Sequence, residues 1–229
     1  MSGPIGPLAN KPEPEGTVKI TRAHPSQKLA SDKRAVLFRV ASTEFADHGF
    51  AQASLNRIIG EIGMSKSSFY HYFQSKEDLF EQALDQALAP LSMALEALDV
   101  SLLTEQTFWP TVQMLIEEMA RMANRSPEVV LVGRMFYRSL DNPEDRALTG
   151  EIMRASTDWL TAIIAHGQQL GLLRTDLPES MLIEATMSVG MALDRWILTR
   201  WDEFSDQERV ALSVKTFDLL VRMLEPREI

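Results

Sequence analysis

Hydrophobic residues recur at helical spacing along almost the whole chain, starting near residue 31. The apolar positions between Leu37 and Phe45 follow one another three or four residues apart, which places them on one face of a helix. Ser31 is positioned to cap the start of this helix, and Gly49 is positioned to end it in a left-handed conformation. The pattern therefore predicts a first amphipathic helix that spans residues 31–49.

Two short helices are predicted next. The first opens at the N-cap Ser54 and ends at Gly63, and the second covers about eight residues, 66–73, after the N-cap Ser65. Ser75, with acidic residues in the turn that follows, opens a longer helix that we expect to end near Pro90. The same periodicity predicts later helices over 105–124, 127–140, 143–170, 178–201 and 206–225.

The predicted fold is all-α, with about nine helices, because no segment shows the alternating pattern of a strand. Residues 1–27 differ from the rest: they hold five of the eleven prolines and show no apolar periodicity. We expect them to form a mostly disordered arm.

Composition narrows the possible chemistry. The chain has 229 residues and no cysteine, which excludes disulfides, a thiolate zinc site and a thiol nucleophile. The four histidines are scattered, and we expect no metal and no cofactor. No apolar run is long enough to span a membrane, and the N-terminus has no secretory signal pattern, so a cytoplasmic protein is expected.

Charge is distributed unevenly along the chain. The formal net charge is −9, yet residues 19–76 carry nine basic and four acidic residues, and residues 87–229 carry 13 basic and 22 acidic ones. A basic head on an acidic body is typical of a protein whose head binds a polyanion such as DNA. Chance unevenness of solvated charge is the alternative.

The two short helices joined by a tight glycine turn have the form of a helix-turn-helix, in which the second helix enters the major groove of DNA. Helical hairpins with a glycine are common, so the residue types matter as well. The outer positions of the second helix are polar, whereas Phe69 and Phe73 fall on its inner face, where we expect them to anchor it. Polar side chains of this kind can reach base edges.

The stretch KRAVLFRVASTEFADHGFAQASLNRIIGEIGMSKSSFYHYFQSKEDLF resembles the DNA-binding domain of the TetR family of bacterial transcription regulators. The run FYHYFQSKEDL is especially diagnostic. The resemblance implies a helix-turn-helix DNA-binding domain over residues 28–75, followed over residues 76–229 by a helical domain for effector binding and dimerisation.

The resemblance also implies roles for individual residues. Ser54 would cap a helix whose N-terminus can face a phosphate. Lys66 would be the strongest candidate for a guanine contact, and Lys76 would contact a phosphate. Lys19 and Arg22 of the arm are possible backbone or minor-groove contacts. The full set of expected DNA-binding residues is Ser54, Asn56, Arg57, Lys66, Ser67, Ser68, Tyr70, His71, Tyr72 and Lys76. Asn56, Arg57 and His71 could instead be ordinary solvent-facing residues.

The last two predicted helices suggest a dimer interface. The segment 206–225 has two apolar stripes, one through Val210 and Phe217 and one through Leu212 and Leu219, so one stripe can face the core and the other a partner. The preceding helix offers small residues that allow close approach. The expected interface residues are Ala185, Ser188, Ala192, Val210, Val214, Phe217 and Val221. A large monomeric core is the alternative.

All four tryptophans and ten of the twelve methionines lie after residue 90, as expected for a helical body with an adaptable apolar effector pocket. The candidate pocket residues are Trp109, Met114, Met135, Phe136, Trp159, Met187, Met191 and Arg195. Any one of them could be simple core, and Arg195 could form an interhelical ion pair.

The function predicted from these features is a homodimeric repressor that binds a near-palindromic operator in double-stranded DNA and is released by a small-molecule effector. A TetR-like activator or a regulator without an effector is the closest alternative. A helical enzyme is disfavoured because the chain has no phosphate-binding glycine loop, no His-x-x-x-His and no nucleophile elbow. A helical interaction module that binds no DNA is a third possibility. The sequence does not identify the effector, the operator or the regulated genes.

Overall fold

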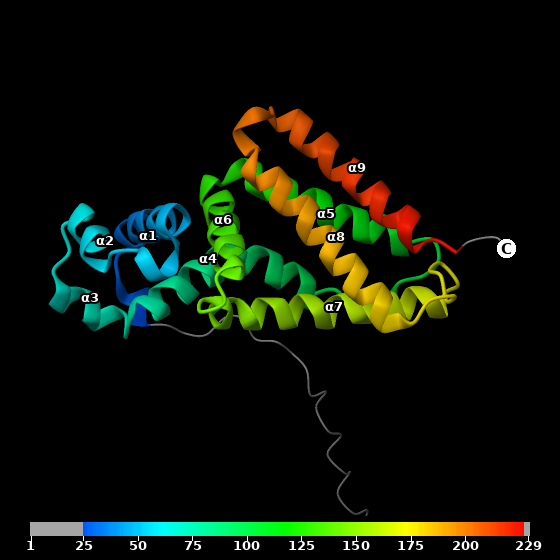
Figure 1. Cartoon of the computed structure of the whole chain (residues 1–229), viewed down its shortest axis with the longest axis horizontal. Coiled ribbons are helices and arrows are strands. Elements are labelled where there is room, and N and C mark those ends of the chain that lie inside the picture. Colours follow the sequence, from blue (N-terminus) through cyan, green and yellow to red (C-terminus); the bar gives the residue numbers. More distant parts are fainter. Residues whose placement is uncertain (1–24, 227–229) are drawn as a thin grey trace, which may run out of the picture.

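The computed structural model of the chain describes residues 25–226, and these contain nine α-helices and four short 3-10 helices (Figure 1). The α-helices are α1 (Ser31–Gln52), α2 (Leu55–Glu61), α3 (Lys66–Tyr72), α4 (Lys76–Glu96), α5 (Phe108–Arg125), α6 (Pro127–Asp141), α7 (Gly150–Gln169), α8 (Glu179–Thr199) and α9 (Asp206–Leu224). The 3-10 helices are η1 (Pro25–Lys28), η2 (Val100–Leu102), η3 (Arg146–Thr149) and η4 (Trp201–Glu203). The predicted all-α fold is confirmed.

The molecule has a small head, α1 to α3, at one end and a larger helical body at the other (Figure 1). α4 runs from the head into the body, and α6 stands between them and packs along α1. One apolar core fills the head and continues into α4 and α6, with Leu79, Phe80 and Met135 among its buried members. The domain boundary expected at residue 75 thus precedes a stretch of α4 that belongs to the core of the head.

Serine side chains begin three of the four N-terminal helices, because each accepts a hydrogen bond from an amide three residues later. Ser54, Ser65 and Ser75 cap α2, α3 and α4 in this way, as predicted. Ser31 does not cap α1: it is the first helical residue, follows the cap position Ala30, and hydrogen-bonds to its neighbour Asp32.

The predicted ends of two helices need correction. α4 continues through Pro90 to Glu96, so Pro90 lies inside the helix and leaves it without one backbone hydrogen bond. Gly49 has a φ of +76°, which interrupts α1 as expected, but one further helical turn follows it. In both places packing of the flanking turns outweighs the local helix-breaking tendency.

The N-terminal arm also differs from expectation where it is described. Residues 25–27, assigned to the arm by sequence, form η1, and Ser26 is only 3% exposed and hydrogen-bonded to Gln82 of α4. η1 also contacts α3. Lys19 and Arg22 lie outside the described residues.

The body consists of α5, α7, α8 and α9 around a second apolar core, and a third, smaller core joins α6 to the end of α8. α9 runs along the upper edge of the body in this view, and α8 runs diagonally between α9 and α7 (Figure 1). None of the helices within residues 25–226 has the length and apolar composition needed to cross a bilayer.

Candidate nucleic-acid interface

The outer face of α3 is polar and open to solvent. Lys66, Ser67, Tyr70 and His71 are exposed, and they are spaced so that they share one side of the helix. Tyr70 is 57% exposed, which is unusual for a large aromatic ring in a folded head. This face presents one cation, a hydroxyl, a phenol and an imidazole, all of which can hydrogen-bond to base edges or phosphates.

The inner face of α3 is fixed by aromatic packing. Phe69 and Phe73 are 0% and 1% exposed, and their rings stack with centroids 5.1 Å apart. The Phe73 ring also meets Phe38 of α1 edge to face at 6.1 Å. Their predicted role as anchors is confirmed. Tyr72, expected at the groove, is half-buried and packs against the same core.

The tight turn between α2 and α3 depends on glycine. Gly63 has a φ of +62°, a conformation that other residues adopt only with strain. The amide of Met64 then donates to the carbonyl of Ile59, which closes the turn. The outer positions of α2, Asn56 and Arg57, are exposed on the same head.

A buried carboxylate that no sequence pattern singled out connects α1 with the start of α2. Glu44 is 7% exposed, accepts a hydrogen bond from the amide of Ser54 at 2.8 Å, and pairs with Arg57 at 3.0 Å. The imidazole of His48 lies 3.6 Å from its other oxygen. Glu44 therefore sets the position of the α2 N-terminus.

Two basic residues that are expected to contact DNA, Arg57 and Lys76, form an ion pair or hydrogen bonds within the head. Arg57 is held by Glu44, although its side chain remains 55% exposed. The ammonium of Lys76 donates to the carbonyls of Phe50 and Ala53 at 2.7 and 3.1 Å and lies over the Phe50 ring. Lys76 thus stabilises the end of α1, and it is only half exposed for a phosphate contact.

We expect Glu44→Gln to lower the free energy of unfolding by about 1 kcal/mol, because the side chain keeps its size but loses the charge that holds the largely exposed Arg57. Operator affinity should fall with it, since the start of α2 is less well positioned. Urea unfolding and DNA titration measure the two effects. Glu61→Gln, which removes the same charge from an exposed site on α2, should leave stability unchanged; equal effects of both substitutions would contradict this role of Glu44.

Comparison with known proteins identifies this head. Residues 37–83, from α1 into α4, match the family described as bacterial regulatory proteins, tetR family. Over 168 residues the chain is 27% identical to the HTH-type transcriptional regulator YdgC of Bacillus subtilis, an alignment that covers 72% of this chain and 79% of that protein. The head is a DNA-binding domain of the TetR family. The chain is therefore a transcriptional regulator that binds DNA through its helix-turn-helix.

Solved structures show that the body has a TetR-like fold as well. A TetR family regulator from Chloroflexus aurantiacus superposes with a TM-score of 0.63 at 19% identity, covering 88% of this chain and 97% of its own. FadR of Bacillus subtilis, solved in complex with stearoyl-CoA, gives 0.61 at 20% identity, covering 82% and 97%. At these identities the likeness establishes the fold alone.

The candidate pocket residues do not lie together. They are spread over different parts of the structure. Trp109, Trp159 and Met187 pack around the core of α5, α7, α8 and α9. Met114 is 57% exposed, and Met135 is 1% exposed in the core shared with the head, so neither packs in that body core. Helical periodicity marked these residues as apolar without indicating which layer each would enter.

The other three candidates lie near α6 and the end of α8. Phe136 and Met191 pack against the small core that joins these helices. Arg195 is exposed and forms a bidentate ion pair with Asp141 of α6, which is the alternative considered for it. The hydrogen bonds to Asp141 raise the pKa of the Arg195 guanidinium above its usual value, so the cation stays fully charged.

Two buried polar atoms near the α5, α7, α8 and α9 core have no hydrogen-bond partner within the described residues: Nε1 of Trp159 on α7 and Oγ1 of Thr186 on α8. A buried donor without an acceptor costs about 1–3 kcal/mol, so these two atoms are exceptions among the buried polar groups. No three His, Asp or Glu side chains among residues 25–226 gather closely enough to hold a metal.

The expected dimer residues divide into three groups by their exposure. Phe217 is 6% exposed and its ring lies 5.9 Å from that of Trp109, so it belongs to the body core. Ser188 and Ala192 are exposed on α8. The half-buried members are Ala185, Val210, Val214 and Val221.

Proposed function

We propose that the chain is a homodimeric repressor that occupies a near-palindromic operator and leaves it when a small molecule binds in the body. The observation that carries the proposal is the polar outer face of α3, whose inner face is locked in the head core. A rigid helix that presents base-reading side chains specifies one sequence, and two copies give the twofold symmetry of a palindrome. Such a protein acts on chromosomal DNA in the cytoplasm.

The outer surface of the body supports the dimer. Small exposed residues, Ser188 and Ala192, are flanked on α8 by Met181 and Trp196, which are 53% and 44% exposed, and Leu219 of α9 is 51% exposed. Small residues between large apolar ones allow two helices to approach closely and bury apolar area. In this arrangement the outward stripe of α9 is the one through Leu219, and the stripe through Phe217 faces inward.

The two unpartnered polar atoms support an effector site in the body. Trp159 supplies an N–H donor, and Thr186 supplies a hydroxyl that both donates and accepts. A largely apolar molecule with one or two hydrogen-bonding groups would satisfy both atoms and pack among the surrounding side chains. FadR, which shares this fold, was solved in complex with stearoyl-CoA, a ligand with a long apolar acyl chain.

Titration of the purified protein with fragments of its own chromosome tests the function. We expect a discrete complex with a fragment that contains an inverted repeat, two chains per site, and an affinity that falls linearly with log salt, with a slope of about −0.9 per phosphate neutralised. Extracts of small metabolites should release the complex. Sequence-independent binding to all fragments would refute the repressor, and unchanged binding with every extract would favour a regulator without an effector.

We expect Ala192→Glu to convert the dimer to a monomer and to weaken operator binding strongly, because two carboxylates would face each other across a twofold axis. Light scattering after size-exclusion chromatography measures the mass, and circular dichroism checks that the helices persist. Ala162→Glu adds the same charge at an exposed position on α7 and should leave the dimer intact. A dimer of Ala192→Glu with wild-type affinity would exclude this face.

A further inference from the structure

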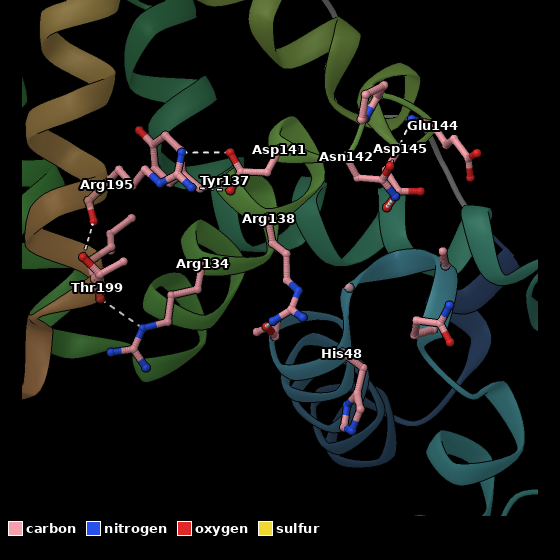
Figure 2. Close-up of a pocket in the computed structure, with 16 residues that line it drawn as sticks. His48, Arg134, Tyr137, Arg138, Asp141, Asn142, Glu144, Asp145, Arg195 and Thr199 are labelled. Carbon is pink, nitrogen blue, oxygen red and sulfur yellow. Dashed lines mark hydrogen bonds and ion pairs between the residues drawn. The ribbon is translucent and has the colours of Figure 1, made fainter.

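A cleft of about 860 Å³ opens between the head and the body, away from the α5, α7, α8 and α9 core (Figure 2). Its walls are the last turns of α1, the outer side of α6 with the loop that follows it, and the end of α8. Its volume is in the range of small-molecule sites. The cleft thus contacts the DNA-binding head and the helices of the body at the same time.

The side chains that face the cleft leave an excess of hydrogen-bond donors. The carboxylate of Asp141 is occupied by Arg195, and that of Asp145 is buried and accepts from Asn142 at 2.9 Å. By contrast, Arg138 donates one hydrogen bond among the described residues, from Nη1 to the carbonyl of Ala46 at 3.0 Å. Most of the five N–H groups of this exposed guanidinium therefore have no protein acceptor.

Two further side chains with N–H groups, Arg134 and His48, line the cleft with Arg138. Arg134 uses Nε for the carbonyl of Leu198 and one amino group for Asp202, which is 84% exposed. His48 contributes an imidazole that is 41% exposed. Figure 2 shows Arg134 and Arg138 on α6 and His48 below them on α1. Glu144 is the remaining acidic side chain in the lining, on the far side of the loop.

Tyr137 also lines the cleft, and its phenol is held in place by burial and by a hydrogen bond. Tyr137 is 8% exposed and donates to a carboxylate oxygen of Asp194 at 2.7 Å. Burial, and then the negative charge of Asp194, raise the pKa of the Tyr137 hydroxyl above its usual value, so it stays protonated and committed to that bond. Tyr137 therefore adds no negative charge to the cleft.

Arg138 also connects the cleft to the end of α1. The guanidinium packs against Gly49, where a Cβ atom would lie 3.2 Å from its Nε. Gly49 has a φ of +76°, and the residues that follow it lead directly into α2. A ligand bound to the free N–H groups of Arg138 would therefore lie next to a contact between α6 and the segment that positions the helix-turn-helix.

We propose that this head–body cleft, which we call the Arg138 cleft, binds a small organic anion through a carboxylate or a phosphate. A guanidinium group can donate two parallel hydrogen bonds to either a carboxylate or a phosphate. The free N–H groups of Arg138 and Arg134 are the donors for such a contact. The anion site is separate from the effector site proposed at Trp159 and Thr186. Binding at the cleft does not depend on the proposed function, whereas its effect on DNA does.

Calorimetry on the full chain without DNA tests the site, with citrate and inorganic phosphate as probes at constant ionic strength. We expect saturable binding of at least one probe, one per chain, and a roughly tenfold or greater loss of affinity in Arg138→Gln. Arg154→Gln removes an exposed arginine of α7 outside the cleft and should bind as the wild type does. Phosphate binding alone assigns the phosphate group, and citrate binding alone assigns the carboxylate.

Two results would overturn the site: no binding of either probe to the wild type, or equal affinity in wild type and Arg138→Gln. Arg138 is exposed, so its replacement should leave the thermal unfolding transition in place, which circular dichroism checks. The coupling to DNA is measured separately, as weakening of the operator complex by the bound probe in Arg154→Gln and not in Arg138→Gln. Probe binding without any change in operator affinity would refute the coupling and leave the site standing.

Discussion

Lys66→Ala is expected to weaken operator binding by roughly ten- to a hundredfold, because a charged contact with a guanine edge contributes about 1–3 kcal/mol to discrimination. Lys66 is the first residue of α3, is exposed, and has no partner among residues 25–226 that would compete for its ammonium. Tyr70→Ala should cause a comparable loss, since it removes the most exposed ring of the same face. Mobility shift with the operator and with a scrambled duplex separates specific from general binding.

The loss should be confined to DNA binding. Neither side chain contributes to the buried core, so the dimer mass and the unfolding transition of both variants should match those of the wild type. Lys215→Ala, which removes an exposed lysine from α9 in the body, is the charge-matched control and should retain full operator affinity. Specific binding that survives in both Lys66→Ala and Tyr70→Ala would show that α3 does not read the operator.

Phe45→Ala should produce the largest loss of stability, about 3–5 kcal/mol, because it removes a fully buried ring and leaves a cavity. The Phe45 ring is 0% exposed and lies 5.1 Å from the ring of Phe80 and 5.8 Å from that of Phe50. These contacts join the middle of α1 to α4 and to the turn that leads into α2. Operator binding should therefore be lost at temperatures where the wild type still binds.

Two spectroscopic signals locate this loss in the head. The tryptophans, at positions 109, 159, 196 and 201, all lie in the body, so their fluorescence reports the body, whereas circular dichroism reports all helices. In urea, the dichroism of Phe45→Ala should change at lower denaturant than the fluorescence. Phe45→Leu, which keeps most of the buried volume, should lose much less. Coincident transitions shifted equally in both signals would show that head and body unfold as one unit.

Local interactions explain why the head could be predicted in such detail. The caps at Ser54, Ser65 and Ser75 join each serine to an amide three residues away, and the turn at Gly63 depends on the φ of a single residue. The spacing of Phe69 and Phe73 likewise places both on the inner side of α3. All of these depend on neighbours within one or two helical turns, which are visible in a sequence.

Contacts between distant segments were decided only by tertiary packing. Glu44 meets Arg57, Arg138 meets Ala46 and Ser26 meets Gln82 across separations that no periodicity encodes. For the same reason a pattern that marked Met114, Met135 and Phe217 as apolar could not assign them to solvent, to the head-side core and to the body core. An amphipathic helix specifies which of its sides is apolar, but the neighbour that covers that side depends on how all the helices pack together.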